Sequence, residues 1–215
     1  MATARVPRPE EAADVNPQTI TVNSNVVPST PACIIANGQQ VTFVNSSGFS
    51  NLYFHFQPDA DAVNGYSLFS DFSIASYNPP NNQVTQTPQV NNRTVNYAIT
   101  VGNQTPTDYP YAIQVGAGPL YVHVWYANNE VNCYPSPAVI PVGGTLELYK
   151  NSNDTNSYPV TWPTPTNPFT PALTGADGLP HTENTGVNSY SYTAAKVGIG
   201  GGTGKGGGTV KIKGA

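Results

Sequence analysis

Residues Pro31–Pro58 read PACIIANGQQVTFVNSSGFSNLYFHFQP, and this stretch decides the fold class. In "VTFV" and "LYFHF" large apolar residues alternate with others, which is the period of β-strands that bury one face and leave the other to solvent. A glycine turn precedes the first alternating run, and a loop rich in Asn and Ser separates the two. The stretch therefore predicts a short apolar strand followed by two half-buried strands.

The same pattern recurs at residues 137–164, which read PAVIPVGGTLELYKNSNDTNSYPVTWPT. The two stretches align without gaps, so that Gly38 falls on Gly144, Phe43 on Tyr149 and Phe54 on Val160. Later parts correspond more loosely: "VNYAITV" with "NSYSYTA", and "GAGPLYVHV" with "GKGGGTVKIK". A repeat of this extent predicts the duplication of a whole sandwich rather than of one hairpin.

The repeat divides the chain into an N-terminal arm (1–18), a first sandwich (19–125) and a second sandwich (126–215). The boundary is expected in "YANNEVNCYPSP", residues 126–137, where Asn and Pro interrupt the alternation. Residues 59–94 have the character of an inserted loop, and long loops often carry binding surfaces. A single larger sandwich, such as a viral jelly roll, is the alternative, and it would make the repeat an accident.

Composition agrees with an all-β protein and excludes two partner classes. The chain has 20 Gly, 21 Pro and 13 Tyr, and charged residues make up only 9% of it, with a formal net charge of -4. Nucleic acid is excluded as a partner because phosphate binding needs clustered basic residues. Lys205, Lys211 and Lys213 do gather near the C-terminus, where they are expected to protect an edge strand. No apolar run reaches the roughly 18 residues of a membrane span.

Localisation and thiol state stay open at the level of sequence. The first residues contain no hydrophobic segment, so they are not a secretory signal. The chain then fits an intracellular assembly or virion-like particle, or a mature extracellular protein whose signal has been removed, in which case Met1 is not native. Cys33 and Cys133 are too few for a disulfide framework or a structural zinc site. They form either one disulfide or two free thiols.

The second repeat resembles the cupredoxins, the plastocyanin and amicyanin group of Greek-key β-sandwiches. The likeness lies in "VIPVGGTLELYKNSNDTNSYPVTW" and in "YSYTA" followed by a glycine-rich loop and "GGTVKIKG". It implies two tandem cupredoxin-like sandwiches. A type 1 copper centre needs two imidazoles, a thiolate and a weak axial ligand. The position of the first histidine holds Tyr158, or Leu52 in the first repeat, and that of the cysteine holds Ala194 or Val101. The resemblance therefore implies domains without metal or other cofactor.

Other chemistry receives little support from the sequence. His55 and His123 alternate with apolar residues, and if they met across paired strands they would make a poor two-ligand metal site. His181, in "GLPHTEN" near Asp177 and Glu183, is expected to be a solvated loop residue. The "GIGGGTGKGGGT" segment is not a phosphate loop, because Gly206 follows Lys205 and no helix is expected after it. We expect no catalytic, cofactor-binding or metal-binding residue, and hence no enzyme.

These observations predict a structural protein that assembles with itself into a coat, sheath, filament or ordered inclusion. Low charge weakens repulsion between copies, and tyrosine in loops suits contact surfaces because it buries a large area at low entropic cost. The alternative is a carbohydrate- or ligand-binding module with its site at 59–94. The tyrosines expected to form an interaction surface, with self or a glycan as partner, are Tyr53, Tyr66, Tyr77, Tyr109, Tyr111 and Tyr126.

Overall fold

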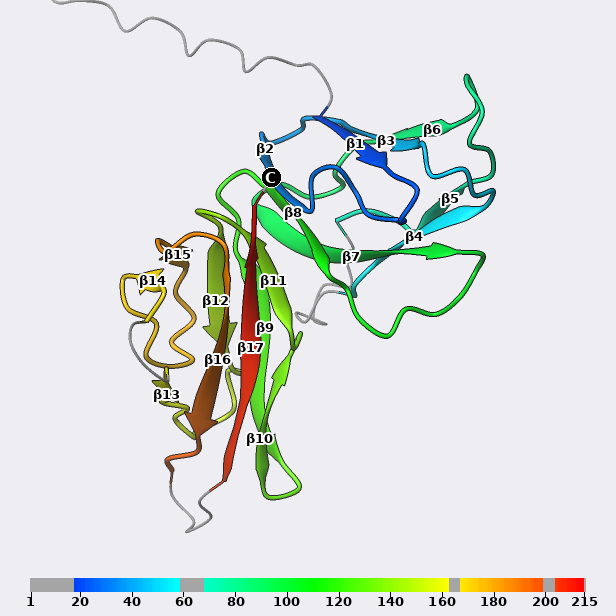
Figure 1. Cartoon of the computed structure of the whole chain (residues 1–215). Coiled ribbons are helices and arrows are strands. Elements are labelled where there is room, and N and C mark those ends of the chain that lie inside the picture. The colour runs from blue at the N-terminus through cyan, green and yellow to red at the C-terminus, as the bar shows by residue number, and fades with distance from the viewer. Residues whose placement is uncertain (1–17, 59–67, 163–166, 199–203, 215) are drawn as a thin grey trace, which may run out of the picture.

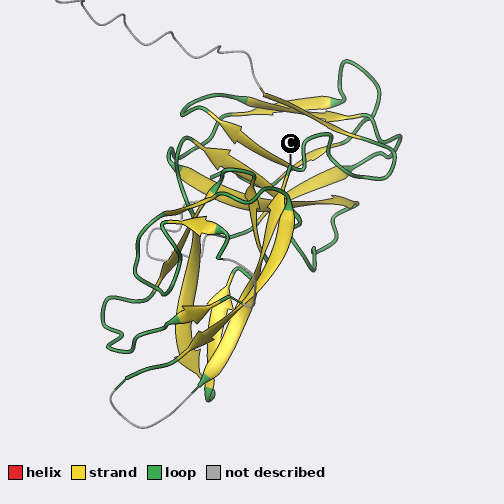
Figure 2. Ribbon diagram, turned by 60° about the vertical axis from the view of Figure 1, so that its left-hand side comes forward, coloured by secondary structure: helices red, strands yellow, loops and turns green. Residues whose placement is uncertain are grey.

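The protein is all-β, and its strands form two sandwiches (Figures 1 and 2). The computed structural model describes residues 18–58, 68–162, 167–198 and 204–214. Within these ranges the strands run from β1 to β17 and no helix occurs. No described segment has the helical length and apolar character needed to cross a membrane.

The first sandwich pairs a sheet of order β1-β3-β6 with a sheet of order β2-β8-β7-β4-β5. Alternating burial in β3 and β4 directs their large apolar side chains between these two sheets. The resulting core is rich in aromatic rings, and the Phe43 and Phe54 ring centroids lie 5.0 Å apart. The strands are β1 (Gln18–Val22), β2 (Ala32–Ile35), β3 (Val41–Asn45), β4 (Leu52–Phe56), β5 (Phe72–Ile74), β6 (Gln83–Gln86), β7 (Arg93–Val101) and β8 (Tyr111–Val115).

The second sandwich pairs a sheet of order β10-β9-β12-β15-β14 with a sheet of order β11-β17-β16-β13. Its core is separate and mainly aliphatic. The strands are β9 (Leu120–Ala127), β10 (Glu130–Tyr134), β11 (Ala138–Pro141), β12 (Thr145–Tyr149), β13 (Val160–Thr161), β14 (Phe169–Thr170), β15 (His181–Glu183), β16 (Asn188–Ala195) and β17 (Lys205–Lys213).

Both sandwiches follow one pairing plan. The parallel pairs β1–β3 and β2–β8 of the first sandwich have counterparts in β9–β12 and β11–β17 of the second. The antiparallel pairs β3–β6, β4–β7 and β7–β8 correspond to β12–β15, β13–β16 and β16–β17. Two sheet pairs with two cores are incompatible with the alternative of a single jelly roll.

The gapless alignment of the two repeats is wrong by one residue where it places β3 on β12. It places Phe43 on Tyr149, yet Phe43 points into the first core and Tyr149 is half-buried in β12, where the core residue is Leu148. The turn before this strand spans residues 36–40 in the first half and only 142–144 in the second. Because side chains alternate along a strand, a slip of one residue exchanges the two faces.

The expected boundary between the domains, 125/126, is also wrong. Strand β9, which begins at Leu120, pairs with β10 and β12 of the second sandwich. The chain passes between the sandwiches at residues 116–119 instead. Asn128 and Asn129, which suggested a linker, both have positive φ, at 53° and 64°, and form the two-residue turn of the β9–β10 hairpin. Such a turn requires φ > 0 at both positions, and Asn tolerates that conformation well.

Two further expectations are corrected by the sheet order. Residues 59–94 are not simply an inserted loop, because they contribute β5 and β6, and β6 has the same place beside β3 that β15 has beside β12. Lys211 and Lys213 do not protect an edge, because their part of β17 lies between β11 and β16. The expected arm falls almost entirely outside the described residues.

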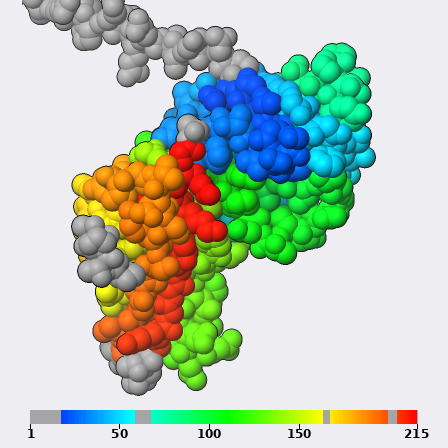
Figure 3. Space-filling model, viewed as in Figure 1, coloured from blue at the N-terminus to red at the C-terminus, as the bar shows by residue number. Residues whose placement is uncertain are grey.

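The sandwiches meet across a small buried junction, and the two lobes are in contact in Figure 3. Ala32, Ala112 and Val139 form its apolar centre. Beside them the side chain of Asn96 bonds to both backbone groups of Val139. Its Nδ2 donates to the Val139 carbonyl (2.5 Å), and its Oδ1 accepts from the Val139 backbone amide (3.0 Å), as a neighbouring strand would do. The side-chain oxygen of Gln114, Oε1, accepts from the backbone amide of Thr145 at 3.0 Å. Directed, buried hydrogen bonds of this kind hold the two sandwiches in one orientation.

Candidate interaction surfaces

The positions that the cupredoxin resemblance assigns to copper ligands do come together in the structure. Leu52 is the direct cross-strand partner of Val101. Tyr158 lies just before β13, whose Val160 is the partner of Ala194. Tyr158 is only 2% exposed, and its hydroxyl donates to Asp154 Oδ2 at 2.6 Å. Burial and the Asp154 carboxylate raise the pKa of Tyr158 to about 12, so this phenol stays protonated at neutral pH.

The histidines do not meet. His55 lies in the first sandwich and His123 in the second. His123 stacks between Trp125 and Tyr149, with ring centroids 5.0 and 5.1 Å away, and burial lowers its pKa although Asp154 acts in the opposite direction. Over the described ranges, no three His, Cys, Asp or Glu side chains gather as a metal site would require.

His55 belongs to an acid–histidine–hydroxyl array. Its Nδ1 lies 3.5 Å from Asp71 Oδ2, and its Nε2 lies 3.0 Å from the Thr100 hydroxyl. The Thr100 hydroxyl already donates to the Gly102 carbonyl at 2.9 Å, so the proton between His55 and Thr100 belongs to Nε2. In this arrangement the ring donates to the hydroxyl and does not activate it as a nucleophile.

His181 was expected to be solvated and is instead 2% exposed in β15. Its Nδ1 lies 2.7 Å from the Pro171 carbonyl, and its Nε2 lies 3.2 Å from the Asp177 carboxylate. Both partners are hydrogen-bond acceptors, so each ring nitrogen faces an oxygen. This residue joins two loops from the inside of the second sandwich.

Both cysteines are free thiols. Cys33 lies in the first core, and burial raises its pKa to about 12. Cys133 lies in β10 of the other sandwich, and burial raises its pKa as well. A thiol held in its neutral form is a poor nucleophile, so neither side chain is suited to redox or covalent chemistry.

The six tyrosines expected to form one surface have different surroundings. Tyr77 is exposed, Tyr111 packs against the first core, and Tyr126 lies under the Lys196 amine, 4.2 Å from its ring centroid. Tyr53 stacks against His55 with centroids 6.2 Å apart. Burial raises the pKa of Tyr109, and the nearby charges of Tyr134 and Asp71 raise it further. Tyr66 lies outside the described residues.

An exposed apolar group lies at the far end of the first sandwich. We call Phe49, Tyr77 and Val101 the apolar tip; their exposed fractions are 44%, 43% and 38%. Two of the loops around them are joined by the buried Asn45, whose amide donates to the carbonyls of Phe49 (2.8 Å) and Ser76 (3.3 Å). Residues 46–51, 75–82 and 102–107 contain no charged side chain. Sequence reasoning missed Phe49 and Val101, although Phe49 stands alone in a polar loop.

A pocket of about 330 Å³ opens at the far end of the second sandwich. We call it the end pocket, and most of its wall is apolar. The backbone around it is tied by two short bridges, between Ser157 and Val197 and between Pro159 and Gly175. No pattern in the sequence predicts it, because its wall comes from four separate segments. Residues in this wall include Lys150, Tyr158, Pro159, Ala176, Asp177 and Val197.

Comparison with known proteins adds little to this picture. No protein-family model and no curated protein matches the chain. Among solved structures, the chain is similar to Lac15 from a marine microbial metagenome (15% identity, TM-score 0.30, covering 93% of this chain and 67% of that one). It is also similar to the laccase-like multicopper oxidase CueO of Ochrobactrum sp. (10% identity, TM-score 0.28, covering 93% of this chain and 63% of that one). A third similar structure is murine CEACAM1b (11% identity, TM-score 0.25, covering 92% of this chain and 99% of that one). Likeness at this level carries no argument about function.

Proposed function

We propose that the protein is a non-catalytic structural subunit that assembles with itself into a coat, sheath, filament or ordered inclusion. The observation that carries the proposal is the apolar tip, where three apolar side chains are exposed in and beside the segments 46–51, 75–82 and 102–107, which contain no charged side chain. Grouped apolar exposure marks an interaction site more often than scattered exposure does. We infer further that the two sandwiches arose by duplication of one cupredoxin-like domain whose ligand positions now hold non-ligating side chains.

The test is the size of the purified protein as a function of concentration. Size-exclusion chromatography with light scattering, followed by negative-stain electron microscopy, is expected to show large ordered particles above a threshold concentration. A single small species at every concentration would contradict self-assembly. Added salt is expected to leave the assembly intact, because an apolar contact is not screened as surface charge pairs are.

A glycan-binding module is the second candidate, and one cluster favours it. Tyr53, His55, Asp71, Tyr109 and Tyr134 are linked by a ring stack, a carboxylate–imidazole contact and electrostatic proximity. Aromatic rings beside a carboxylate offer a sugar both a stacking face and a hydrogen-bond acceptor. Binding to a glycan array that is lost in Tyr109→Ala and kept in Tyr190→Ala would favour this candidate over the structural role.

A further inference from the structure

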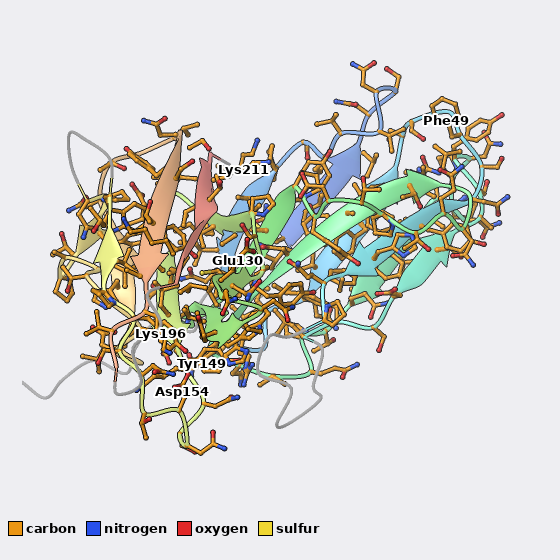
Figure 4. All side chains as sticks on the ribbon, turned by 90° about the horizontal axis from the view of Figure 1, so that it is seen from below. Phe49, Glu130, Tyr149, Asp154, Lys196 and Lys211 are labelled. Carbon is orange, nitrogen blue, oxygen red and sulfur yellow. The ribbon has the colours of Figure 1, made fainter. Side chains whose placement is uncertain are left out.

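The apolar tip and the end pocket lie at opposite ends of the molecule. Figure 4 shows Phe49 at the upper right, and Asp154 and Lys196, which lie close in sequence to wall residues of the end pocket, at the lower left on the other sandwich. In Figure 1 the same ends are those where β5 and β6, and then β13, are labelled. The directed hydrogen bonds of the junction fix the distance and angle between them.

The tip presents its aromatic ring on a fixed backbone. The Phe49 amide donates to the Ser47 hydroxyl (3.1 Å), and the Phe49 carbonyl accepts from Asn45. The Asn51 amide donates to the Ala75 carbonyl (3.3 Å), and the Gly102 amide donates to the Asn51 carbonyl (2.9 Å), so all three loops are connected. A contact made by such loops costs little ordering entropy on binding.

The end pocket suits an aromatic ring. Two of its polar side chains are already engaged: the Tyr158 hydroxyl donates to Asp154, and the Lys150 amine donates to the backbone carbonyls of Asp154 (2.8 Å) and Asn156 (2.6 Å). Pro159, Ala176 and Val197 supply apolar wall for the face of a ring. A volume of about 330 Å³ is at the low end for ligand pockets and accommodates one ring side chain.

We propose that Phe49 of one copy inserts into the end pocket of the next copy, so that the chains associate head to tail. This inference rests on the proposed self-assembly and specifies its contact. Because tip and pocket are different surfaces, the contact is heterologous, and it produces an open filament or a ring rather than a symmetric dimer. The fixed junction between the sandwiches sets the repeat from one copy to the next.

A second copy fits the tip better than a lipid surface does. Surfaces that dock on anionic membranes carry lysine and arginine around their apolar residues, and the three tip loops contain none. The end pocket, in contrast, offers the tip an apolar partner on the same chain. Sedimentation with phosphatidylcholine and phosphatidylserine vesicles tests the competing idea.

Two variants remove one partner each. Phe49→Asp places a charge on the tip, and Val197→Asp, at a residue 58% exposed, places one at the pocket. Each is expected to raise the concentration needed for assembly at least about tenfold, as the loss of an interface hot spot does. Val187→Asp adds the same charge at a residue 67% exposed outside both surfaces, and it should assemble like the unmodified protein. Thermal unfolding of every variant shows that each one is folded.

Mixing the two variants gives the decisive measurement. Phe49→Asp retains an intact pocket and Val197→Asp an intact tip, so an equal mixture is expected to form a dimer containing one of each and nothing longer. Native mass spectrometry reports that composition directly.

The outcomes separate the inference from the function on which it rests. If the unmodified protein assembles and Phe49→Asp assembles equally well, or if the mixture gives no mixed dimer, the tip–pocket contact is wrong while self-assembly stands. If vesicle binding depends on Phe49 and assembly does not, the tip is a membrane contact and the inference is overturned. If the unmodified protein never assembles, the proposed function itself fails.

Discussion

Glu183 shows how a single buried carboxylate organises one edge of the second sandwich. It is 4% exposed and accepts from the amides of Gly143 (2.8 Å) and Gly186 (2.6 Å), and from both the amide and the hydroxyl of Thr185. Burial acts to raise the pKa of Glu183, but these hydrogen bonds together outweigh it, and the pKa lies below its usual value. The charged form is therefore the one that stabilises the fold.

Replacing this carboxylate is expected to lower stability and to change its pH dependence. Glu183→Gln turns an NH₂ group toward backbone donors, which should cost about 1 to 3 kcal/mol in the free energy of unfolding at neutral pH. Because the folded pKa lies below the unfolded value, the contribution of Glu183 is present above its usual pKa and is lost as the pH falls through the folded one. In urea unfolding, the free energy of unfolding of the variant should therefore fall less on acidification than that of the unmodified protein. Glu130→Gln, on an exposed glutamate, is the matched control; the same pH dependence in all three proteins would contradict the prediction.

At the scale of elements, the turn between β9 and β10 depends on two residues with positive φ. Asn128 is exposed and has φ 53°, a conformation that is costly for a β-branched side chain. Asn128→Val is expected to destabilise the hairpin and its sandwich by about 1 to 2 kcal/mol. Asn128→Gly removes the same side chain but adopts positive φ freely, so its change should be much smaller. Chemical denaturation of the two variants measures the difference, and equal destabilisation would show that the turn conformation is not the cause.

How far the sequence predicts each element depends on whether its signal is local. Alternation in β3 and β4 predicts both strands and the burial of Phe43 and Phe54, since the period of two is set by the strand itself. The boundary was misplaced because an Asn–Asn pair between alternating strands was interpreted as a linker, although that pattern is typical of a hairpin turn. The end pocket could not be predicted, because its wall residues meet only through long-range strand pairing.

At the scale of the whole molecule, the central question is whether the two cores unfold together. Each sandwich has its own core, and the contact between them is small. Asn96 occupies the place of a missing strand beside β11, because its side chain pairs with both backbone groups of Val139. Without it, a buried amide and a buried carbonyl lose their partners, and each such loss costs about 1 to 3 kcal/mol.

Asn96→Leu is therefore expected to uncouple the sandwiches. Calorimetry of the unmodified protein should give one transition, because the junction links the cores, whereas the variant should give two, with the second sandwich losing the stability that Asn96 provides at the edge of β11. Asn25→Leu, at an exposed loop position, introduces the same apolar side chain away from the junction and should retain a single transition. If Asn96→Leu also unfolds in one step, at an unchanged temperature, Asn96 does not carry the coupling between the domains. If the unmodified protein already unfolds in two steps, the junction does not couple the domains, and a head-to-tail assembly would lack the fixed angle between its ends that a regular repeat requires.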